Sequence, residues 1–185
     1  MHHSLKFYGG HRKGVLRFYM FWARLTKIPW LGRLVRWIAN NYGRNTHRAY
    51  LLTPVEAEDL VTIAEGVALG PCDCRRVFRN CDNPVDAEIL LGPTRHILLE
   101  AMPHDAYEIT KVKAKEILRE GHQRGLIHTI LKCRGDFYAI CNCCTCCCVP
   151  LRLSKQYGIG NALIRHTNIV QEFKEYQLAH RAGKA

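Results

Sequence analysis

Six of the eight residues from Cys141 to Cys148 are cysteine, and this density restricts the functions open to the chain more than any other segment. A chain of 185 residues can bury a substantial apolar core, so it does not need disulfides to stay folded. Neighbouring cysteines also pair poorly with one another. Thiolates, by contrast, are soft ligands that suit zinc and iron–sulfur clusters. The run therefore predicts bound metal in a reducing compartment, with an oxidised disulfide framework as the competing interpretation.

The spacing of the cysteines predicts how they divide among metal centres. Cys141, Cys144 and Cys147 follow the C-x2-C-x2-C pattern with which a short loop wraps a four-iron cluster. Cys143 and Cys146 repeat C-x2-C out of phase, which favours a second centre. Zinc is the alternative metal, although two C-x2-C pairs roughly 15 to 20 residues apart, as in a zinc ribbon, are lacking. Cys133 is either a further ligand or a buried thiol. The predicted metal ligands are Cys72, Cys74, Cys81, Cys141, Cys143, Cys144, Cys146, Cys147 and Cys148.

Several segments together resemble a known family. They are PCDCR at 71–75, Cys81 followed by NPVDA at 83–87, ITKVKAKEIL at 109–118, GLIH at 125–128 and ICNCCTCCC at 140–148. This pattern resembles prokaryotic ferredoxin-like iron–sulfur proteins, in which C-x-C-R and I-C-N-C-C-x-C-C-C segments flank a helix and a G-L-V-H stretch. The resemblance spans residues 51–150 and implies one or two 4Fe-4S clusters and electron transfer, in cells that live largely without oxygen. Many such proteins continue into a two-cluster ferredoxin module, but this chain has no cysteine after Cys148, which favours a dedicated subunit.

Around the cysteines, the sequence predicts short helices and strands. Thr53, Pro54 and Glu56 form a helix-start signal, so a helix is expected over 54–65. Strands are expected at 67–69 and 87–92, and helices at 95–102, from Thr110 to 121–125, and at 169–180. The segments 126–131 and 137–141 predict a hairpin that leads into the cysteine run. His128 in this hairpin is a structural histidine in the favoured interpretation and a cluster ligand in the alternative. These elements predict an α+β fold: a small body of mixed helices and strands (mixed α/β), with the cysteine loops at the ends of strands.

The first 50 residues differ from the rest in charge. They hold ten Lys or Arg and no Asp or Glu, whereas residues 51–185 hold 17 basic and 16 acidic residues. Basic and apolar side chains fall on opposite faces at helical spacing on both sides of Pro29, which predicts a pair of basic amphipathic helices. Their charges recur too often for a transmembrane span. Three interpretations are open: packing on the body, binding to a membrane surface or membrane-bound partner, and binding to nucleic acid. The residues predicted to make membrane or partner contacts are Arg17, Trp22, Arg24, Lys27, Trp30, Arg33, Arg36 and Trp37.

These patterns predict three segments: a basic amphipathic helical arm at 1–50, an iron–sulfur-binding body at 51–168, and a C-terminal helix and tail at 169–185. The sequence offers no paired carboxylates, nucleophile elbow or phosphate-binding glycine loop, so an electron carrier is expected rather than an enzyme. We expect a redox partner protein or membrane-bound complex at the cytoplasmic face of a membrane, and no nucleic acid. A zinc-stabilised interaction module and an iron–sulfur enzyme with an open iron site are the alternatives.

Overall fold

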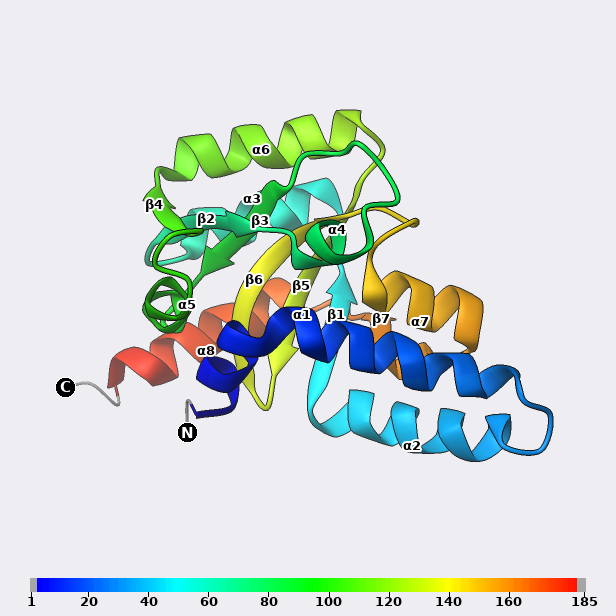
Figure 1. Ribbon diagram of the computed structural model, residues 1–185. Coiled ribbons are helices and arrows are strands. Elements are labelled where there is room, and N and C mark those ends of the chain that lie inside the picture. The colour runs from blue at the N-terminus through cyan, green and yellow to red at the C-terminus, as the bar shows by residue number, and fades with distance from the viewer. Residues whose placement is uncertain (1–2, 183–185) are drawn as a thin grey trace.

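The computed structural model describes residues 3–182 and shows an α+β fold, as predicted (Figure 1). A seven-stranded sheet has the order β4-β2-β3-β6-β5-β1-β7, with all neighbours antiparallel except the parallel pair β1 and β7. The strands are β1 (His47–Leu51), β2 (Val67–Pro71), β3 (Asp86–Leu91), β4 (Tyr107–Ile109), β5 (Ile127–Cys133), β6 (Asp136–Cys143) and β7 (Leu163–Arg165). The helices are α1 (His3–Arg24), α2 (Gly32–Asn45), α3 (Pro54–Ile63), α4 (Asp73–Phe78), α5 (Arg95–Ala101), α6 (Lys111–Gln123), α7 (Val149–Tyr157) and α8 (Ile169–Ala182), with 3-10 turns η1 (Leu25–Lys27) and η2 (Gly160–Ala162).

Local signals set the starts of two helices on the body. At α3, the Glu56 N–H donates to Thr53 Oγ1 at 3.2 Å and the Thr53 N–H donates to Glu56 Oε2 at 2.7 Å, which completes the predicted capping box. At α6, the Lys113 N–H donates to Thr110 Oγ1 at 3.1 Å. These bonds satisfy backbone donors that have no partner inside the helix.

The predicted hairpin is strands β5 and β6, and it carries the chain into the cysteine run. Its two turn residues, Arg134 and Gly135, both have positive φ, at 48° and 99°. Positive φ at both central positions matches the natural twist of paired strands, so the turn holds their register. Strand β6 lies in the middle of the sheet between β3 and β5, which places its last residues deep in the molecule.

Helices cover both faces of the sheet (Figure 1). On one face, α3, α6 and α8 bury Leu60, Leu118 and Phe173 against the strands. On the other face, α1, α5 and α7 bury residues such as Tyr8, Leu98 and Val149. The predicted C-terminal helix is therefore part of the main core, and residues 183–185 of the predicted tail lie outside the described residues.

The arm folds as a hairpin of α1 and α2 against the second face. Tyr8, Leu16, Met20 and Ala23 are buried, and their spacings of eight, four and three residues mark one stripe of α1 that packs on the body. The aromatic stripe that includes Trp22 points outward instead. Packing on the body thus accounts for one apolar stripe of the arm but not for the other. Within residues 3–182, no helix combines the length and apolar character needed to cross a bilayer.

Candidate metal centre

The geometry of strand β6 divides the cysteine run into two sets. Successive side chains of a strand point to opposite faces, so Cys141 and Cys143 both point to the face that α1 covers, while Asn142 points to the other. The chain leaves the strand after Cys143, turns through residues 144–147, and starts α7 with Cys148 as the N-cap residue. The remaining cysteines of the run therefore leave the backbone in new directions.

One set, the four-cysteine group, comprises Cys81, Cys144, Cys146 and Cys147. Their sulfur atoms all lie within 4.8 Å of one another, a spacing that allows them to bind one metal ion together. Three of the Sγ–Sγ distances are 3.7 Å for Cys81–Cys144, 3.8 Å for Cys81–Cys147 and 3.9 Å for Cys146–Cys147. Cys144 and Cys147 are buried and the other two are partly exposed, so the group lies close to the surface.

The other set, the five-cysteine group, comprises Cys72, Cys74, Cys141, Cys143 and Cys148. Cys72 precedes α4 as its N-cap residue and Cys74 lies in that helix, where the Val149 N–H at the start of α7 donates to its Sγ at 3.5 Å. All five side chains line one cavity of about 610 Å³ beneath α1 and α2. Cys143 and Cys148 lie in one buried cluster, and Cys141 packs against it. The structure thus places all nine predicted ligands in one of two adjacent groups.

The predicted assignment of cysteines to the two centres was wrong. The spacing predicted that Cys141, Cys144 and Cys147 would share one centre, but Cys141 belongs to the five-cysteine group and the other two to the four-cysteine group. The physical reason is that β6 stays extended through Cys143. Loop spacing therefore applies only from Cys144 onward, and the two-residue period of the strand governs the residues before it.

Polar groups around the four-cysteine group donate to its sulfurs. The Asn80 backbone N–H donates to Cys147 Sγ at 3.3 Å, and Asn83 Nδ2 donates to Cys81 Sγ at 3.5 Å. Burial raises the pKa of Cys81, but hydrogen bonds from Asn83 and the neighbouring thiols outweigh it and bring the pKa to about 6. Burial instead raises the pKa of Cys147 to about 12. Hydrogen bonds to sulfur stabilise thiolates, which are the metal-binding form.

Arg75 of α4 places a positive charge between the two groups. It is 2% exposed, and its guanidinium donates to the carbonyls of Pro84 and Asn142. Cys72, Cys143 and Cys144 are its charge partners, so it faces members of both groups. Thiolates together with bound metal carry net negative charge, and a buried guanidinium offsets it.

Two residues that the sequence left open now have structural positions. Cys133 is buried among Tyr8, Tyr138 and Ala139, apart from both groups, and burial raises its pKa to about 11. His128 pairs with Asn142 across β5 and β6, and its Nδ1 is 2.7 Å from Asn142 Oδ1. Both side chains lie on the face of the sheet opposite Cys141 and Cys143. Burial lowers the pKa of His128. His128 therefore holds the strand that carries the cysteines, as expected of a structural histidine.

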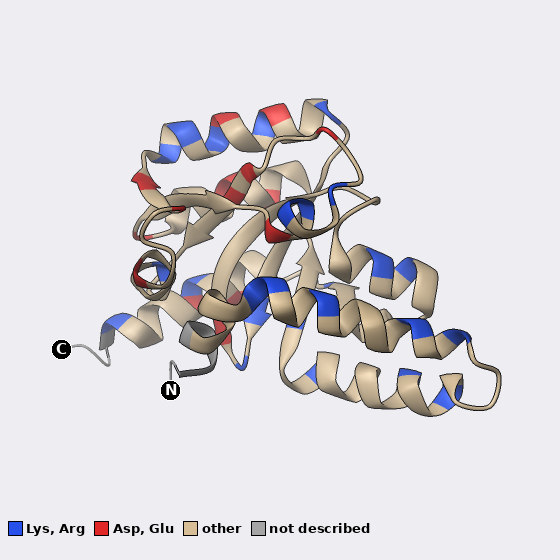
Figure 2. Ribbon diagram, viewed as in Figure 1, with Lys and Arg blue, Asp and Glu red and all other residues tan. Residues whose placement is uncertain are grey.

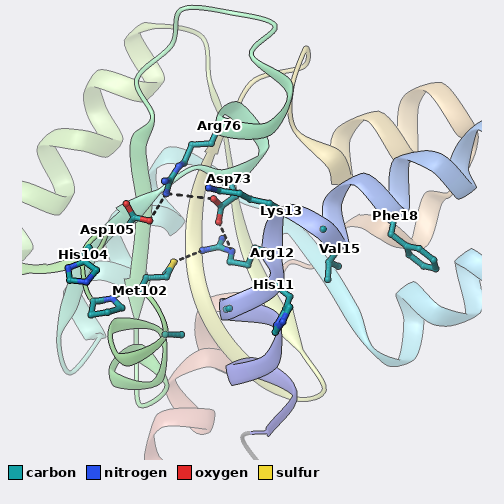
Figure 3. Close-up of a pocket in the computed structure, with 15 residues that line it drawn as sticks. His11, Arg12, Lys13, Val15, Phe18, Asp73, Arg76, Met102, His104 and Asp105 are labelled. Atoms are coloured by element: carbon teal, nitrogen blue, oxygen red, sulfur yellow. Dashed lines mark hydrogen bonds and ion pairs between the residues drawn. The ribbon is translucent and has the colours of Figure 1, made fainter.

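Sequence reasoning missed Arg12, which fastens the arm beside the five-cysteine group. Its Nη2 lies 2.6 Å from Glu88 Oε1, its Nε 3.1 Å from Asp73 Oδ2 and its Nη1 3.5 Å from Met102 Sδ. Figure 3 shows Arg12 and Asp73 in a groove of about 720 Å³ between α1 and the α5–β4 segment, with Arg76 bridging Asp73 and Asp105. Arg12 completes a series with a step of four residues, at positions 8, 12, 16 and 20, whose other members Tyr8, Leu16 and Met20 are buried. This spacing could have identified Arg12 as a residue that faces the body.

The residues predicted for membrane or partner contact lie mainly on the outside of the arm. Lys and Arg residues line α1 and α2 without any acidic residue (Figure 2). Trp22, Trp30 and Trp37 are 46%, 81% and 68% exposed. Arg36 differs from the others because its Nη1 donates to the Thr26 carbonyl at 2.9 Å and stabilises the turn between the helices. The other exposed contact residues are Arg17, Arg24, Lys27 and Arg33.

No protein-family model, curated protein or solved structure matches this chain. The chemistry of the site therefore follows from the positions of its cysteines.

Proposed function

We propose that this protein is an iron–sulfur electron-transfer protein whose surface-accessible centre is the four-cysteine group. The observation that carries the proposal is a set of four thiols that lie close enough together to bind metal, two of them partly exposed at the surface. Four thiolates leave a bound metal no open position for a substrate, which argues against catalysis at this group. The two apolar clusters that pack on the faces of the sheet contain none of these four cysteines, which favours a functional role for a metal bound there.

The chain's own residues would tune such a centre. An iron–sulfur cluster bound there supplies a site that accepts and releases an electron. The donors Asn80 and Asn83 and the nearby cation of Arg75 stabilise added negative charge, which raises the reduction potential. The partly exposed Cys81 and Cys146 leave one side of the centre open to a redox partner protein or complex.

A zinc-stabilised interaction module is the second candidate, and the sulfur spacing favours it. Four sulfurs placed tetrahedrally about 2.3 Å from one zinc ion lie about 3.8 Å apart, close to the 3.7–3.9 Å distances found here. A four-iron cluster places iron and sulfide between its ligands and needs wider spacing. Binding such a cluster therefore requires the segments that carry Cys81 and residues 144–147 to move apart.

Metal analysis separates the two candidates. Anaerobically purified protein is assayed for iron, zinc and acid-labile sulfide, and its visible spectrum is recorded before and after dithionite. Iron with matching sulfide, and a broad band near 400 nm that bleaches, are expected. The Cys81→Ser/Cys146→Ser variant should lose part of this content, whereas Cys133→Ser should keep all of it. Zinc without sulfide at the four-cysteine group would overturn the electron-transfer proposal.

We further propose that the arm holds the protein against an anionic membrane surface. The arm exposes the apolar residues Phe18, Phe21, Trp30, Leu34 and Trp37. Packing on the body does not explain them, because α1 packs on the body through a different stripe. Arg17, Arg24, Lys27 and Arg33 are exposed on the same pair of helices and their connecting turn, and positions 1–50 hold no acidic residue. Aromatic side chains beside Lys and Arg are typical of helices that lie in the interface of a bilayer.

Sedimentation with phosphatidylcholine vesicles, with and without phosphatidylserine, tests the arm. We expect binding that requires phosphatidylserine and weakens with salt. The Trp30→Ala/Trp37→Ala variant should bind at least tenfold more weakly, because it removes two exposed indoles. Tyr107→Ala on β4 is the matched control, since Tyr107 is 56% exposed but lies away from the arm. Binding unaffected by the tryptophan changes, or no binding by the full chain, would contradict the proposal.

A further inference from the structure

We infer that the five-cysteine group is a second metal centre, suited to a polynuclear iron–sulfur cluster and enclosed by helix α1. Its thiols come from three places in the fold: the start of α4, the end of β6 and the start of α7. They converge on one cavity although Cys72 and Cys148 are 76 positions apart in the chain. This site goes beyond the proposed function because none of its ligands belongs to the four-cysteine group.

The spacing of the five sulfurs favours a cluster over a single ion. Among the described residues, only the four-cysteine group brings three or more candidate ligand atoms within 4.8 Å of one another. The thiols of the five-cysteine group instead line one cavity without any three of their sulfur atoms lying within that distance of one another. A cluster carries several irons and therefore bridges more widely spaced thiolates.

The cavity supplies the room and the shielding that such a cluster needs. It measures about 610 Å³, so a cluster requires no opening of the sheet. Helix α1 contributes the apolar residues Leu16, Tyr19 and Ala23 to the wall of the cavity. The charged residues Arg12, Asp73 and Glu88 also line it, and they are paired with one another. Cys143 and Cys148 are 5% and 3% exposed, and burial of this kind lowers the reduction potential of a cluster. The arm therefore has a second role as the cover of this centre.

The two cysteine groups contain residues that are consecutive in the chain. Cys143 and Cys144 are consecutive residues of different groups, and so are Cys147 and Cys148. Consecutive Cα atoms lie about 3.8 Å apart, so two bound centres would be near neighbours. Arg75 faces both groups and adjusts their charge together. Electrons would then pass between the shielded centre under α1 and the surface-accessible one.

Paired substitutions test the second centre in the full chain. Iron, zinc and acid-labile sulfide per chain are measured for the wild type, for Cys141→Ser/Cys143→Ser and for Cys81→Ser/Cys146→Ser. We expect each double variant to lose a different part of the metal and sulfide content. Cys141→Ser/Cys143→Ser should lack the sulfide that belongs to the five-cysteine group. Cys133→Ser is the control, because Cys133 is a buried thiol on the same hairpin outside both groups.

The outcomes separate this inference from the proposed function. A folded Cys141→Ser/Cys143→Ser variant with the metal and sulfide content of the wild type would overturn the second centre and leave the four-cysteine proposal intact. Loss of sulfide in this variant, with zinc at the four-cysteine group, would support the second centre and overturn the other proposal. If the strand variant does not fold, Cys72→Ser/Cys74→Ser gives the same test from the start of α4, outside the sheet.

Discussion

Replacement of Arg12 by methionine should loosen the arm and destabilise the protein by about 3–5 kcal/mol. Arg12 is 5% exposed and Glu88 is fully buried, with Asp73 as the second carboxylate against the same guanidinium. Removing one member of a buried ion pair leaves the other charged without a partner, at a cost of about 3–5 kcal/mol. Within residues 3–182, the ion pair that Asp73 keeps is with Arg76, at 4.0 Å. The equilibrium constant for folding should fall by about two to four powers of ten.

A double-mutant cycle measures this coupling. Urea unfolding is followed by circular dichroism under anaerobic conditions for Arg12→Met, Glu88→Met and the double variant. Glu88→Met should cost less than Arg12→Met, because Arg12 retains Asp73. The double variant should recover much of the loss, since an apolar pair replaces a buried ion pair at little cost. Arg17→Met is the control on the same helix, and its effect should stay within about 0.5 kcal/mol because Arg17 is exposed.

Two results would refute this reasoning. A loss below about 1 kcal/mol for Arg12→Met would mean that the guanidinium does not hold α1 on the body. Additive effects of the two substitutions would mean that Arg12 and Glu88 act independently. Proteolysis near residues 25–31 provides a separate reading of arm detachment, because it detects local opening even when the body remains folded.

The stability of the α3 start should depend on pH. The hydrogen bond from Arg165 lowers the pKa of Glu56, so this group contributes stability above the ordinary carboxyl pKa and loses it as pH falls through the folded value. Glu56→Gln should therefore lower the free energy of unfolding by about 0.5–1 kcal/mol at pH 7 and leave it unchanged at pH 2. Urea unfolding at each pH measures this difference, and a difference that does not depend on pH would contradict the prediction. Gly121→Ala should cost about 1–3 kcal/mol, because its Cβ would lie 2.9 Å from the Asn142 side chain. Gly14→Ala, with no atom within 4 Å of the new Cβ, should be neutral or stabilising in the same assay; equal effects would exclude the steric explanation.

Much of the body could be predicted from local patterns. Capping at Thr53 and Thr110, the turn at Arg134 and Gly135, and the hairpin into the cysteines all depend on residues close together in the chain. Helices α4 and α7 were not predicted, because each is short and directly follows a cysteine that had been assigned only a ligand role. Strand β1 was also missed, since the charge pattern placed it within the arm, although it pairs with β5 in the sheet.

The sequence by itself determined that many thiols gather in one place, that the body mixes helices and strands, and that positive charge concentrates in the first 50 residues. These properties depend on composition and on short-range periodicity. Only the tertiary structure decided which cysteines lie together and which stripe of α1 is buried. The direction of a side chain depends on whether its backbone is strand, turn or helix, and Cys143 and Cys144 diverge at the residue where β6 ends. Long-range packing likewise brought Cys81 to the run and Arg12 to Glu88, contacts that no local pattern specifies.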